Sequence, residues 1–596
     1  MCRISGIIHL TTPPQYEKIH AMCDSMKHGG PDDSGIYLDD TYHVALGHRR
    51  LSLLDLTSAG HQPMQSSNKK VCIVFNGEIY NYLEIKNILI SLGHQFVSNT
   101  DTEVIVASYE QWGTACFEKF NGMFALALFD KVSGKLILAR DHAGIKPLYY
   151  SINKEAIYFS SEVRAFKSLD HNWKQAEDWR IYFLLFGYIP EPFTTLENVF
   201  SLEKGTYKVI DLHTFKVVDT KYFQFNYHYS IFSEQEAIVK IRTAMEKAVK
   251  QHLISDAPIG LFLSGGIDSS ILTLLANKYG GSQLQTLSID FEETSYSEHQ
   301  YQQLIIDATK ANHQTFKVSK HDFLNAIPDI LSAIDQPSND GINSYFITKY
   351  AKEAGLKAVL SGLGADELFG GYPSFNRVNK LKIAKYIPNY LLQAAVLFPD
   401  DKRKKIQFLA DQTFPGNYLF NRGFFTPDAV STYLDIPLNK VTQVINSLSV
   451  PKNIYSLHPL EQVSYEETNW YMTNQLLKDT DYMSMWNSVE VRVPFLDKEL
   501  MQLIYSIHPD IRYSHKQIKH LLIKSFIDVL PEAIWNRPKQ GFVFPFQHWF
   551  ADSNLSFVNN VHAEKLKSGL KSGKTHWSRY WCYNLIHQTP NPQSAW

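Results

Sequence analysis

The segment at residues 259–270 places a short apolar run directly before a turn of small and hydroxylated residues. Residues 259–263 have the length and composition of a buried strand, and the apolar positions from Ile271 onward follow a helical spacing. A turn between a strand and a helix presents free backbone N–H groups at the positive end of the helix dipole, and its glycines let a ligand approach closely. The sequence therefore predicts a polyphosphate site in this turn.

The turn itself reads Ser264-Gly265-Gly266-Ile267-Asp268-Ser269-Ser270, without the Gly-Lys-Ser/Thr ending of a Walker A loop. It resembles instead the pyrophosphate loop of enzymes that split ATP into AMP and pyrophosphate. In such a loop Asp268 is well placed to hold Mg²⁺, a hard cation that prefers carboxylate and phosphate oxygens. A flexible Gly/Ser turn is the alternative, and seven consecutive matches directly after a strand argue against it.

The length of the chain, 596 residues, exceeds what one hydrophobic core can organise and predicts roughly two to four domains. With 44% apolar residues, 20% charged residues and a formal net charge of −2, the composition gives no reason to expect nucleic acid or a membrane as partner. The longest apolar runs fall short of a bilayer span and no leader-like segment opens the chain, so we expect a cytoplasmic protein. Five scattered cysteines suggest reduced thiols, and neither a disulfide framework nor a zinc site.

The first residues are Met1-Cys2-Arg3, so removal of Met1 would leave Cys2 with both a thiol and a free α-amine. An α-amine has a pKa near about 8, which lets it act as a general base for the thiol beside it. The thiolate that forms is the nucleophilic species. A cysteine at position 2 is usually accidental when it stands alone, so the motifs that follow decide its meaning.

Six glycine-rich or polar motifs follow Cys2 in a fixed order, at residues 30–35, 47–52, 75–81, 100–103, 121–125 and 139–141. Strand-like segments and a few helix-period segments lie between them, which predicts an α+β layered domain. The order and the residues of these motifs resemble those of class II glutamine amidotransferases, the N-terminal-nucleophile glutaminases, from Cys2 to about Glu162. The fold that this resemblance implies is a layered αββα N-terminal-nucleophile hydrolase domain.

The resemblance assigns roles in glutamine hydrolysis. Cys2 would attack the side-chain amide of glutamine, and its α-amine would carry the proton. The side-chain amide of Asn76 and the backbone N–H of Gly77 match the family's oxyanion hole, where such donors contribute about 3–4 kcal/mol each. Arg50 would bind the α-carboxylate through a two-pronged ion pair, and Asp101 would bind the α-ammonium. The same pocket would include Leu51, Ser52 and Glu78.

One departure from this family lies in the pocket loop. The family usually has His-Arg-Gly-Pro-Asp where this chain has His28-Gly29-Gly30-Pro31-Asp32. A cation near the pocket is therefore missing, although no reacting atom is affected.

A second domain is predicted to begin near residue 230, which divides the chain into residues 2–230 and 231–596. Ser233 and Glu236 are spaced as a capping box for a new helix. Strands predicted at 259–263, 285–291, 314–318 and 358–361 alternate with helices. This alternation predicts a parallel sheet with ligands at the carboxyl ends of its strands. Residues 373–474 are predicted to form short, interrupted helices.

The last of these strands ends in Ser361-Gly362-Leu363-Gly364-Ala365-Asp366, where Asp366 is a second candidate Mg²⁺ ligand facing Asp268. Together with residues 489–497 and 537–542, this motif resembles the synthetase domain of glutamine-dependent asparagine synthetases over roughly residues 233–550. The fold that this implies is an α/β parallel-sheet ATP-pyrophosphatase domain with additional helices.

The second resemblance implies an ATP site. The residues that would flank the adenine and ribose are Leu263, Ile289, Ser361 and Gly362, and those that would hold the pyrophosphate are Ser264, Gly265, Gly266, Asp268, Ser269 and Ser270. Lys539 matches the lysine that steadies the pentavalent phosphate and the acyl-adenylate. Together the loop, Lys539 and a Mg²⁺ ion held by Asp268 and Asp366 would neutralise charge on the departing pyrophosphate.

The leading interpretation is a glutamine-hydrolysing asparagine synthetase that joins these two sites. Ammonia released at Cys2 would pass through an internal channel and attack aspartyl-AMP, giving asparagine, glutamate, AMP and pyrophosphate. The partners expected are the small molecules glutamine, aspartate and ATP. A homodimer is one oligomeric state compatible with this interpretation.

Leu363 supports an alternative acceptor. Asparagine synthetases generally have Ser-Gly-Glu-Gly where this chain has Leu363, and that glutamate lies beside the acyl-adenylate, where it is thought to help ammonia attack. Because a leucine cannot accept a proton, the alternative keeps every step and changes the acceptor to another carboxylate, such as a uronic acid of a cell-surface glycan. A third interpretation is a non-catalytic relative, against which the intact Cys2, Asn76, Asp268, Asp366 and Lys539 argue.

Overall fold

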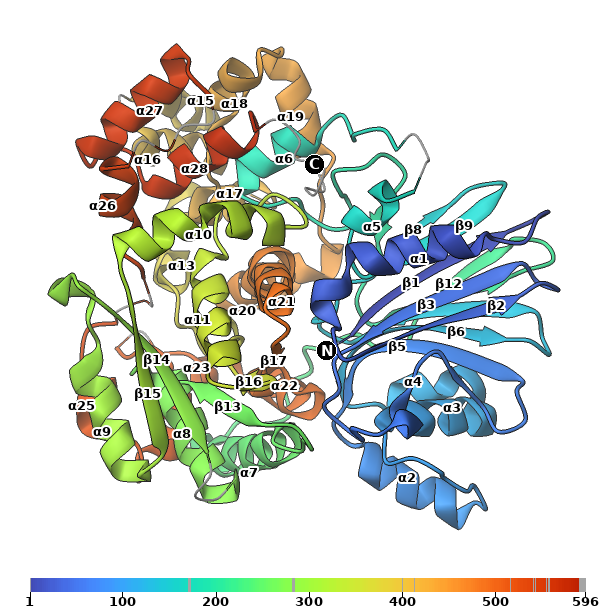
Figure 1. Ribbon diagram of the computed structural model, residues 1–596. Coiled ribbons are helices and arrows are strands. Elements are labelled where there is room, and N and C mark those ends of the chain that lie inside the picture. Colours follow the sequence, from blue (N-terminus) through green and yellow to red (C-terminus); the bar gives the residue numbers. More distant parts are fainter. Residues whose placement is uncertain are drawn as a thin grey trace.

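The computed structural model describes residues 2–169, 173–280, 284–398, 400–411, 413–514, 516–539, 541, 543–553, 555 and 558–588. The described residues form two bodies that lie side by side (Figure 1), a sheet-rich N-terminal body and a larger C-terminal body. None of the described helices is long and apolar enough to span a bilayer. All five cysteines are buried and free.

The N-terminal body contains two antiparallel sheets of six strands each. One has the order β10-β8-β9-β1-β3-β2, with β1 Arg3–His9, β2 Asp33–Asp39, β3 Val44–Arg50, β8 Tyr149–Ile152, β9 Ala156–Ser160 and β10 Phe200–Ser201. The other has the order β12-β11-β7-β6-β5-β4, with β4 Met64–Gln65, β5 Val71–Ile79, β6 Gly122–Asp130, β7 Lys135–Arg140, β11 Thr206–Asp211 and β12 Val217–Lys221.

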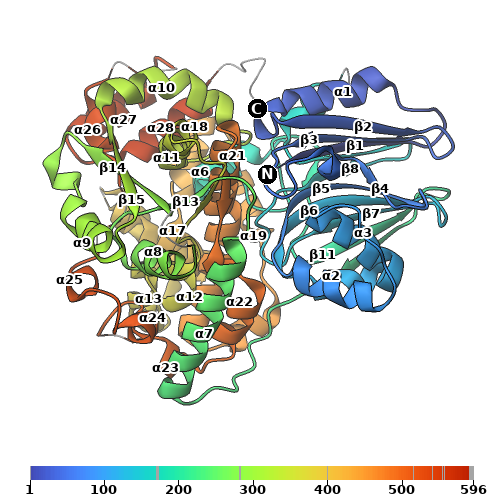
Figure 2. The ribbon, with the colours of Figure 1, turned by 60° about the horizontal axis from the view of Figure 1, so that its bottom comes forward.

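Alternating apolar residues fill the space between the two sheets. Ile4 and Ile8 of one sheet meet Val74 and Leu138 of the other in one buried cluster. Helix α1 (Tyr16–Ser25) covers the outer face of the first sheet, and α2 (Tyr82–Ser91) and α3 (Asp101–Trp112) cover the second (Figure 2). The predicted αββα layering is thus confirmed.

The C-terminal body is built on a five-stranded parallel sheet with the order β15-β14-β13-β16-β17. Its strands are β13 Ile259–Phe262, β14 Gln285–Phe291, β15 Asn312–Val318, β16 Ala358–Leu360 and β17 Glu490–Arg492. The helices packed around it include α7 Glu234–His252, α8 Ile267–Gly280, α9 His299–Thr309, α11 Ile342–Glu353 and α21 Leu477–Trp486. The predicted α/β parallel-sheet fold is confirmed, and β17 is a strand that the sequence pattern did not predict.

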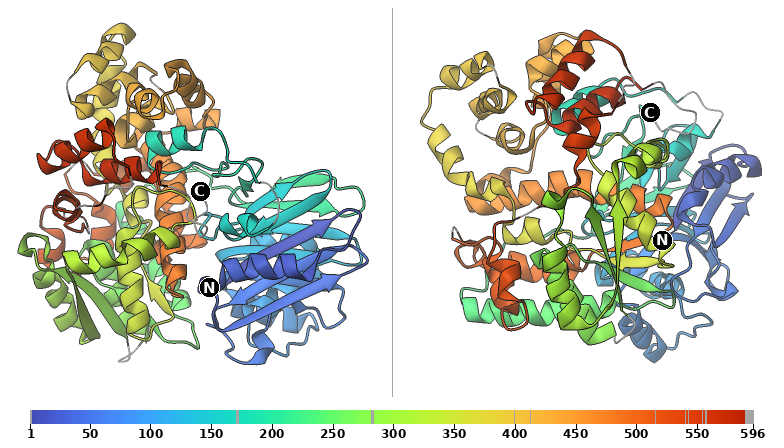
Figure 3. Two further views of the ribbon diagram at one scale, coloured as in Figure 1. Left: turned by 45° about the horizontal axis from the view of Figure 1, so that its top comes forward. Right: turned by 60° about the vertical axis from the view of Figure 1, so that its left-hand side comes forward.

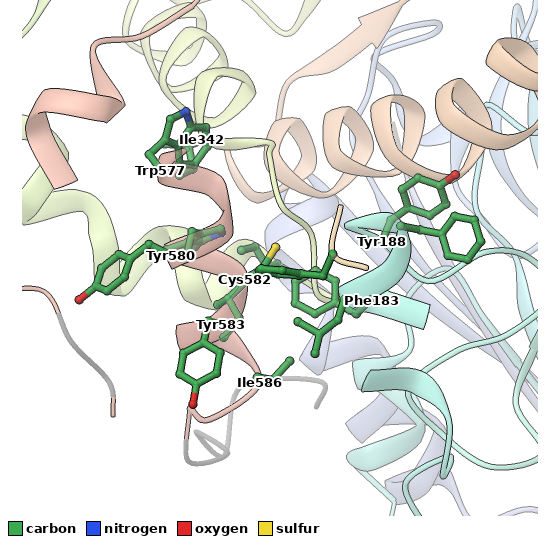
Figure 4. Close-up of a cluster of buried hydrophobic side chains, with 14 of the residues drawn as sticks. Phe183, Tyr188, Ile342, Trp577, Tyr580, Cys582, Tyr583 and Ile586 are labelled. Carbon is green, nitrogen blue, oxygen red and sulfur yellow. The ribbon is translucent and has the colours of Figure 1, made fainter. Parts of the chain in front are cut away.

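Helices from four distant parts of the chain gather above this sheet (Figure 3). They include α6 Trp179–Phe186, α10 Lys320–Ala333, α17 Gly416–Arg422, α18 Pro427–Leu434, α19 Leu438–Asn446, α26 Phe546–Ala551, α27 Val561–Lys571 and α28 Trp577–Leu585. Figure 4 shows Phe183 of α6 and Cys582 of α28 in one buried cluster. Although α6 precedes the boundary predicted near residue 230, its side chains therefore belong to the core of the C-terminal body.

Buried charges join the two bodies. Arg3 of β1 contacts Glu162 at 2.6 Å and Asp481 of α21 at 2.7 Å, and all three side chains are almost fully buried. Removing one partner of such a pair leaves an uncompensated charge, at a typical cost of about 3–5 kcal/mol. This network fixes the first residues of the chain against the C-terminal body.

Candidate active sites

Cys2 lies at the interface of the two bodies, immediately before β1. Its side chain is buried, its backbone N–H donates to Oδ1 of Asn76 at 3.2 Å, and its Sγ lies 4.0 Å from the carbonyl oxygen of Leu51. Burial raises the pKa of the Cys2 thiol to about 11, against smaller opposing effects that include the Leu51 carbonyl contact. The thiol is therefore protonated near neutral pH and needs a base beside it in order to react. Met1 lies outside the described residues.

Asn76 and Gly77 are adjacent on β5 and lie beside Cys2. Asn76 is fully buried, and its side-chain Nδ2 has no hydrogen-bond partner among the described residues. Gly77 has φ +153°, and a Cβ there would lie 2.0 Å from the carbonyl oxygen of Met123, so only glycine fits. A buried amide donor without a partner is uncommon in folded proteins. Here it is available to an oxygen atom of a ligand bound near Cys2.

Arg50 supplies a buried positive charge near this site. Its guanidinium donates to the carbonyl oxygens of Leu54, Asp55 and Thr57 at 3.0, 2.6 and 3.1 Å, and within the described ranges it forms no ion pair. A Cβ at Gly60 would lie 1.9 Å from Nη2 of Arg50, so Gly60 makes room for the guanidinium. A cation held only by carbonyl groups retains most of its capacity to bind a carboxylate.

Two buried carboxyl groups, those of Glu78 on β5 and Asp101 beside it, lie close enough to interact. Asp101, the first residue of α3, accepts from the backbone N–H of Ile79 at 2.9 Å, and burial raises its pKa to about 7. Burial also raises the pKa of Glu78 well above its usual value, although Arg492 opposes this from 3.3 Å. Both acids would become more readily ionised beside an arriving ammonium group.

The loop that lacks the family's arginine is held by other contacts. The carboxylate of Asp32 accepts from the backbone N–H of Ser52 at 2.8 Å and pairs with Lys357 at 2.7 Å. A Cβ at position 29 would lie 2.6 Å from Cγ of Arg3, so a glycine at this position leaves space for the Arg3 side chain. The loop is therefore tied both to the pocket and to the C-terminal body.

Strand β17 separates this pocket from a second site. Nε of Arg492 lies 2.6 Å from Glu490, and its Nη1 donates to the carbonyl oxygens of His252 and Ile254 at 2.7 and 2.6 Å. Val491, between these two charged residues, lines a cavity of about 740 Å³. The alternation of a strand thus directs Arg492 toward Glu78 and Val491 toward the other site.

The second site is a cavity of about 740 Å³ at the carboxyl ends of β13 and β16. The predicted phosphate loop forms one wall. The backbone N–H of Ser264 donates to Oγ of Ser269 at 3.2 Å, and the N–H of Gly266 donates to Oγ of Ser264 at 3.3 Å. Gly265 has φ +77°, a conformation that favours glycine. Helix α8 begins directly afterward, so its N-terminus faces the cavity.

Asp268 and Asp366 meet across this cavity, as predicted. The ammonium of Lys519 lies 2.5 Å from Asp268 and 2.6 Å from Asp366, and Lys539 lies 2.6 Å from Asp366. Burial raises the pKa of Asp268, whereas at Asp366 the two lysines outweigh burial and lower the pKa. Oδ1 of Asp268 is buried and has no hydrogen-bond partner in the described residues.

Some of the other residues predicted for the ATP site line this cavity, and some do not. Leu263, Ser361 and Gly362 line the cavity together with the loop, whereas Ile289 lies in a buried apolar cluster next to Phe291. The positions of the predicted site that are absent from the lining are Gly265, Ser270 and Ile289. Gln540 and Phe542, part of the motif after Arg537, lie outside the described residues.

Sequence reasoning missed several residues of the second site. Lys519, which joins the two aspartates, lies in a segment without a recognised motif. Arg537 was in a recognised motif but received no role, and it donates to the carbonyl oxygen of Gly265 and to Glu298 at 3.0 and 2.9 Å. Asp340 lines the cavity, and burial raises its pKa to about 6.

Two models of known protein families match separate parts of the chain. The model of the glutamine amidotransferase domain matches residues 1–223, and the model of asparagine synthase matches residues 240–574. Fold and matches together define a glutamine amidotransferase domain joined to a synthetase domain. More particularly, the chain belongs to the asparagine synthase family.

Individual relatives span nearly the whole chain. Glutamine-hydrolyzing asparagine synthetase 1 of Bacillus subtilis is 32% identical over 581 residues, which cover 95% of this chain and 90% of the relative. Asparagine synthetase 3 of the same organism is 28% identical, covering 95% and 90%. The amidase chry2 of Gibberella zeae is 26% identical, covering 92% and 90%. The chain is thus similar over nearly its whole length both to relatives named asparagine synthetases and to one named an amidase.

Proposed function

We propose that this protein forms asparagine from aspartate, with glutamine as the nitrogen source and ATP as the source of energy. The observation that carries the proposal is the pairing of two sites across β17. On one side Cys2 lies beside the unpartnered amide of Asn76, and on the other the loop at residues 264–270 faces Asp366. The family match and the names of the relatives support aspartate as acceptor over a uronic acid.

The first half-reaction takes place at Cys2. After removal of Met1, the α-amine would take the proton of the thiol, whose raised pKa requires such a base. Sulfur would then attack the side-chain carbonyl of glutamine, and Nδ2 of Asn76 and the N–H of Gly77 would bind the oxyanion. Ammonia leaves with the proton, and water releases glutamate from the thioester. Arg50 would hold the α-carboxylate of glutamine, while Asp101 and Glu78 would face its α-ammonium.

The second half-reaction would take place in the cavity at the carboxyl ends of β13 and β16. A carboxylate oxygen of aspartate would attack the α-phosphorus of ATP, the bond to the β-phosphate oxygen would break, and pyrophosphate would leave. The loop N–H groups and the α8 N-terminus would bind the leaving pyrophosphate. Lys519 and Lys539 would oppose its negative charge.

A Mg²⁺ ion fits the carboxylates of this cavity. Asp268 and Asp366 share one cationic partner, and Oδ1 of Asp268 is a buried acceptor without a partner among the described residues. Mg²⁺ is usually held by one or two carboxylates together with substrate phosphates. These two carboxylates would hold the ion, and the ion would supply further positive charge for the phosphates. Within the described ranges no cluster of three or more His, Cys, Asp or Glu side chains forms a metal site.

The final step needs a group that accepts a proton as ammonia becomes an amide. Leu363 cannot accept one, although it lies in the cavity wall. We assign this role to Asp340, which lines the same cavity and whose pKa of about 6, raised by burial, suits a base that works near neutral pH. Ammonia would displace AMP from the acyl carbon, giving asparagine.

The buried, free thiols of all five cysteines support a reducing compartment, and we propose a cytoplasmic location. The proposal is tested by Cys2→Ala, which should abolish glutamine hydrolysis and spare AMP formation driven by added ammonium. Cys23→Ala, which removes another buried thiol, is the matched control and should keep both activities. Glutamine hydrolysis by the Cys2→Ala variant would refute the assignment.

A further inference from the structure

A second cavity, of about 350 Å³, lies among the added helices and takes no part in the reaction described above. It is formed by α17, α28 and the short helix η7 (Lys405–Asp411). Five of the lining residues are Phe, Tyr or Trp: Phe186, Tyr418, Phe424, Tyr471 and Trp577. The volume falls in the range of small-molecule sites, which are mostly apolar with a few polar groups.

Lys405 places a positive charge in this cavity without a balancing carboxylate. Its side chain is half-buried and forms no hydrogen bond or ion pair in the described part of the chain. Burial, together with the nearby Arg579, Arg377 and Arg422, lowers the pKa of Lys405 to about 7. A lysine held near three arginines is destabilised in its charged form unless an anion binds there.

Asn421 adds a second unsatisfied group. It lines the same cavity and is only 9% exposed, yet neither Oδ1 nor Nδ2 of its side-chain amide has a hydrogen-bond partner among the described residues. A buried polar group without a partner destabilises a protein by about 1–3 kcal/mol, and such groups in native structures usually meet a ligand or water. Its N–H donors and the ammonium of Lys405 both suit an oxyanion.

The remaining charges of the cavity are also mostly positive. Arg422 is paired with Glu467 at 2.8 Å and lies over the ring of Tyr471, 3.7 Å from its centre. Arg579 donates to the carbonyl oxygen of Phe424 at 2.7 Å and also faces the cavity. Asp340 is the one carboxylate among the lining residues that the structure describes.

Asp340 and Tyr471 connect this cavity to the ATP site, because both residues line both cavities. A ligand bound near Lys405 would therefore lie directly behind the wall of the site where the acyl group is transferred. Asp340, to which we assign proton transfer, is the charged group common to the two.

We propose that the cavity between η7, α17 and α28 is a binding site for the carboxylate or phosphate group of a small molecule that lies next to the acyl-transfer site. Lys405 and Asn421 bind the anionic group, and the aromatic side chains contact the rest of the ligand. Two sources fit this chemistry, namely a separate anion and a second anionic group of an extended acceptor. That the neighbouring cavity is an acyl-transfer site rests on the proposed function, whereas the anion site itself does not.

The test is a titration of the full-length protein with inorganic phosphate, followed by calorimetry and by thermal unfolding. Mg²⁺ and a non-hydrolysable ATP analogue, α,β-methylene ATP, are present in excess, so that phosphate does not enter the 264–270 loop. Wild type should bind phosphate and unfold at a higher temperature with it. Lys405→Met and Asn421→Leu should each weaken binding about tenfold or more, because each removes a donor to the anion.

Lys402→Met is the matched control, since Lys402 is an exposed lysine three residues away. It should bind phosphate as wild type does. Lys405→Met should also raise the unfolding temperature without phosphate, because it removes a charge repelled by three arginines. A purely structural lysine would give the opposite shift. Should Lys405→Met fail to fold, Lys405→Gln keeps a polar side chain of similar length and gives the same comparison.

The kinetics of aspartate-dependent AMP formation separate the two sources. Phosphate that competes with aspartate points to an extended acceptor, and phosphate that changes the rate without competing points to a separate anion; either result supports the site. Equal phosphate binding by wild type, Lys405→Met and Asn421→Leu would overturn the inference. If wild type bound phosphate as expected but formed no asparagine or AMP from aspartate, ATP and glutamine, only the proposed function would be contradicted.

Discussion

The guanidinium of Arg492 lies 3.3 Å from the carboxylate of Glu78, so a side chain from the synthetase sheet contacts the predicted glutamine pocket. Both residues are buried, and Arg492 also donates to the carbonyl oxygens of His252, the last residue of α7, and of Ile254 just beyond it. The state of one site can therefore influence the other through β17. This contact motivates the first prediction.

Arg492→Met should lower the kcat/KM of glutamine hydrolysis by about 100-fold or more. The substitution leaves Glu78 buried without its cation, and breaking such a pair typically costs about 3–5 kcal/mol. Lys498→Met is the control, because Lys498 also bridges the two bodies but bonds the carbonyl oxygens of Glu118 and Phe120. Wild-type glutamine kinetics in Arg492→Met would show that the contact has no role in the pocket.

Asp268→Asn and Asp366→Asn should each abolish ATP-dependent AMP formation and leave glutamine hydrolysis largely intact. Each removes a carboxylate that we propose holds Mg²⁺, and each unbalances Lys519. The measurement is AMP release over a range of Mg²⁺ concentrations, with Asp307→Asn at an exposed position as the control. If either variant made AMP at the wild-type rate, the metal assignment would be wrong.

Leu363→Glu should hold or raise asparagine formation if aspartate is the acceptor, because a carboxylate beside the acyl group can assist proton transfer. Asp340→Asn should lower the ammonia-dependent rate by about 10²–10⁴-fold, the usual contribution of a general base. In the double variant, the new glutamate should restore part of the activity lost at Asp340. A strong loss in Leu363→Glu alone would indicate an apolar pocket for a larger acceptor.

The stability of the N-terminal body should fall in mild acid because of His48. Burial lowers the pKa of this histidine to about 3, and its Nε2–H donates to the carbonyl oxygen of Phe75 at 3.1 Å. Its contribution to stability is complete above the unfolded-state pKa of about 6.5 and decreases as the pH falls toward about 3. At pH 5 the loss is about 2 kcal/mol, because protonation then favours the unfolded chain.

His48→Gln keeps a donor for Phe75 and cannot titrate in this range. Denaturant unfolding of wild type and variant at about pH 8 and pH 5 should show a smaller acid destabilisation in the variant. His20→Gln, at an exposed histidine, should retain the wild-type dependence on pH. Identical pH dependence in His48→Gln and wild type would contradict the buried, neutral state of His48.

The sequence allowed both folds to be predicted because each has a local signal. Strand 285–291 was predicted at its observed bounds, since its apolar residues Leu287, Ile289 and Phe291 alternate with polar ones at the two-residue period of a strand. Strand β17 was missed because two of its three residues, Glu490 and Arg492, are charged and find their partners only in the folded chain. Lys519 was missed for the same reason, since its two aspartates are 251 and 153 positions away and only the packing of the sheet brings them together.

The packing of α6 was also beyond local reasoning. Its residues are apolar on nearly every side, which indicates burial but not in which body. In contrast, Cys2, Asn76, Asp268 and Asp366 could be proposed as site residues from motifs, because the chemistry proposed for them requires fixed neighbours in the chain.

The most direct test of the central claim follows the side-chain nitrogen of glutamine. The purified protein is incubated with aspartate, ATP, Mg²⁺ and glutamine whose side-chain amide carries heavy nitrogen, and the products are measured by mass spectrometry. The account predicts heavy asparagine and AMP in equal amounts, and neither product when aspartate is omitted. Glutamate release without any aspartate-dependent AMP, at every concentration of aspartate tested, would contradict it.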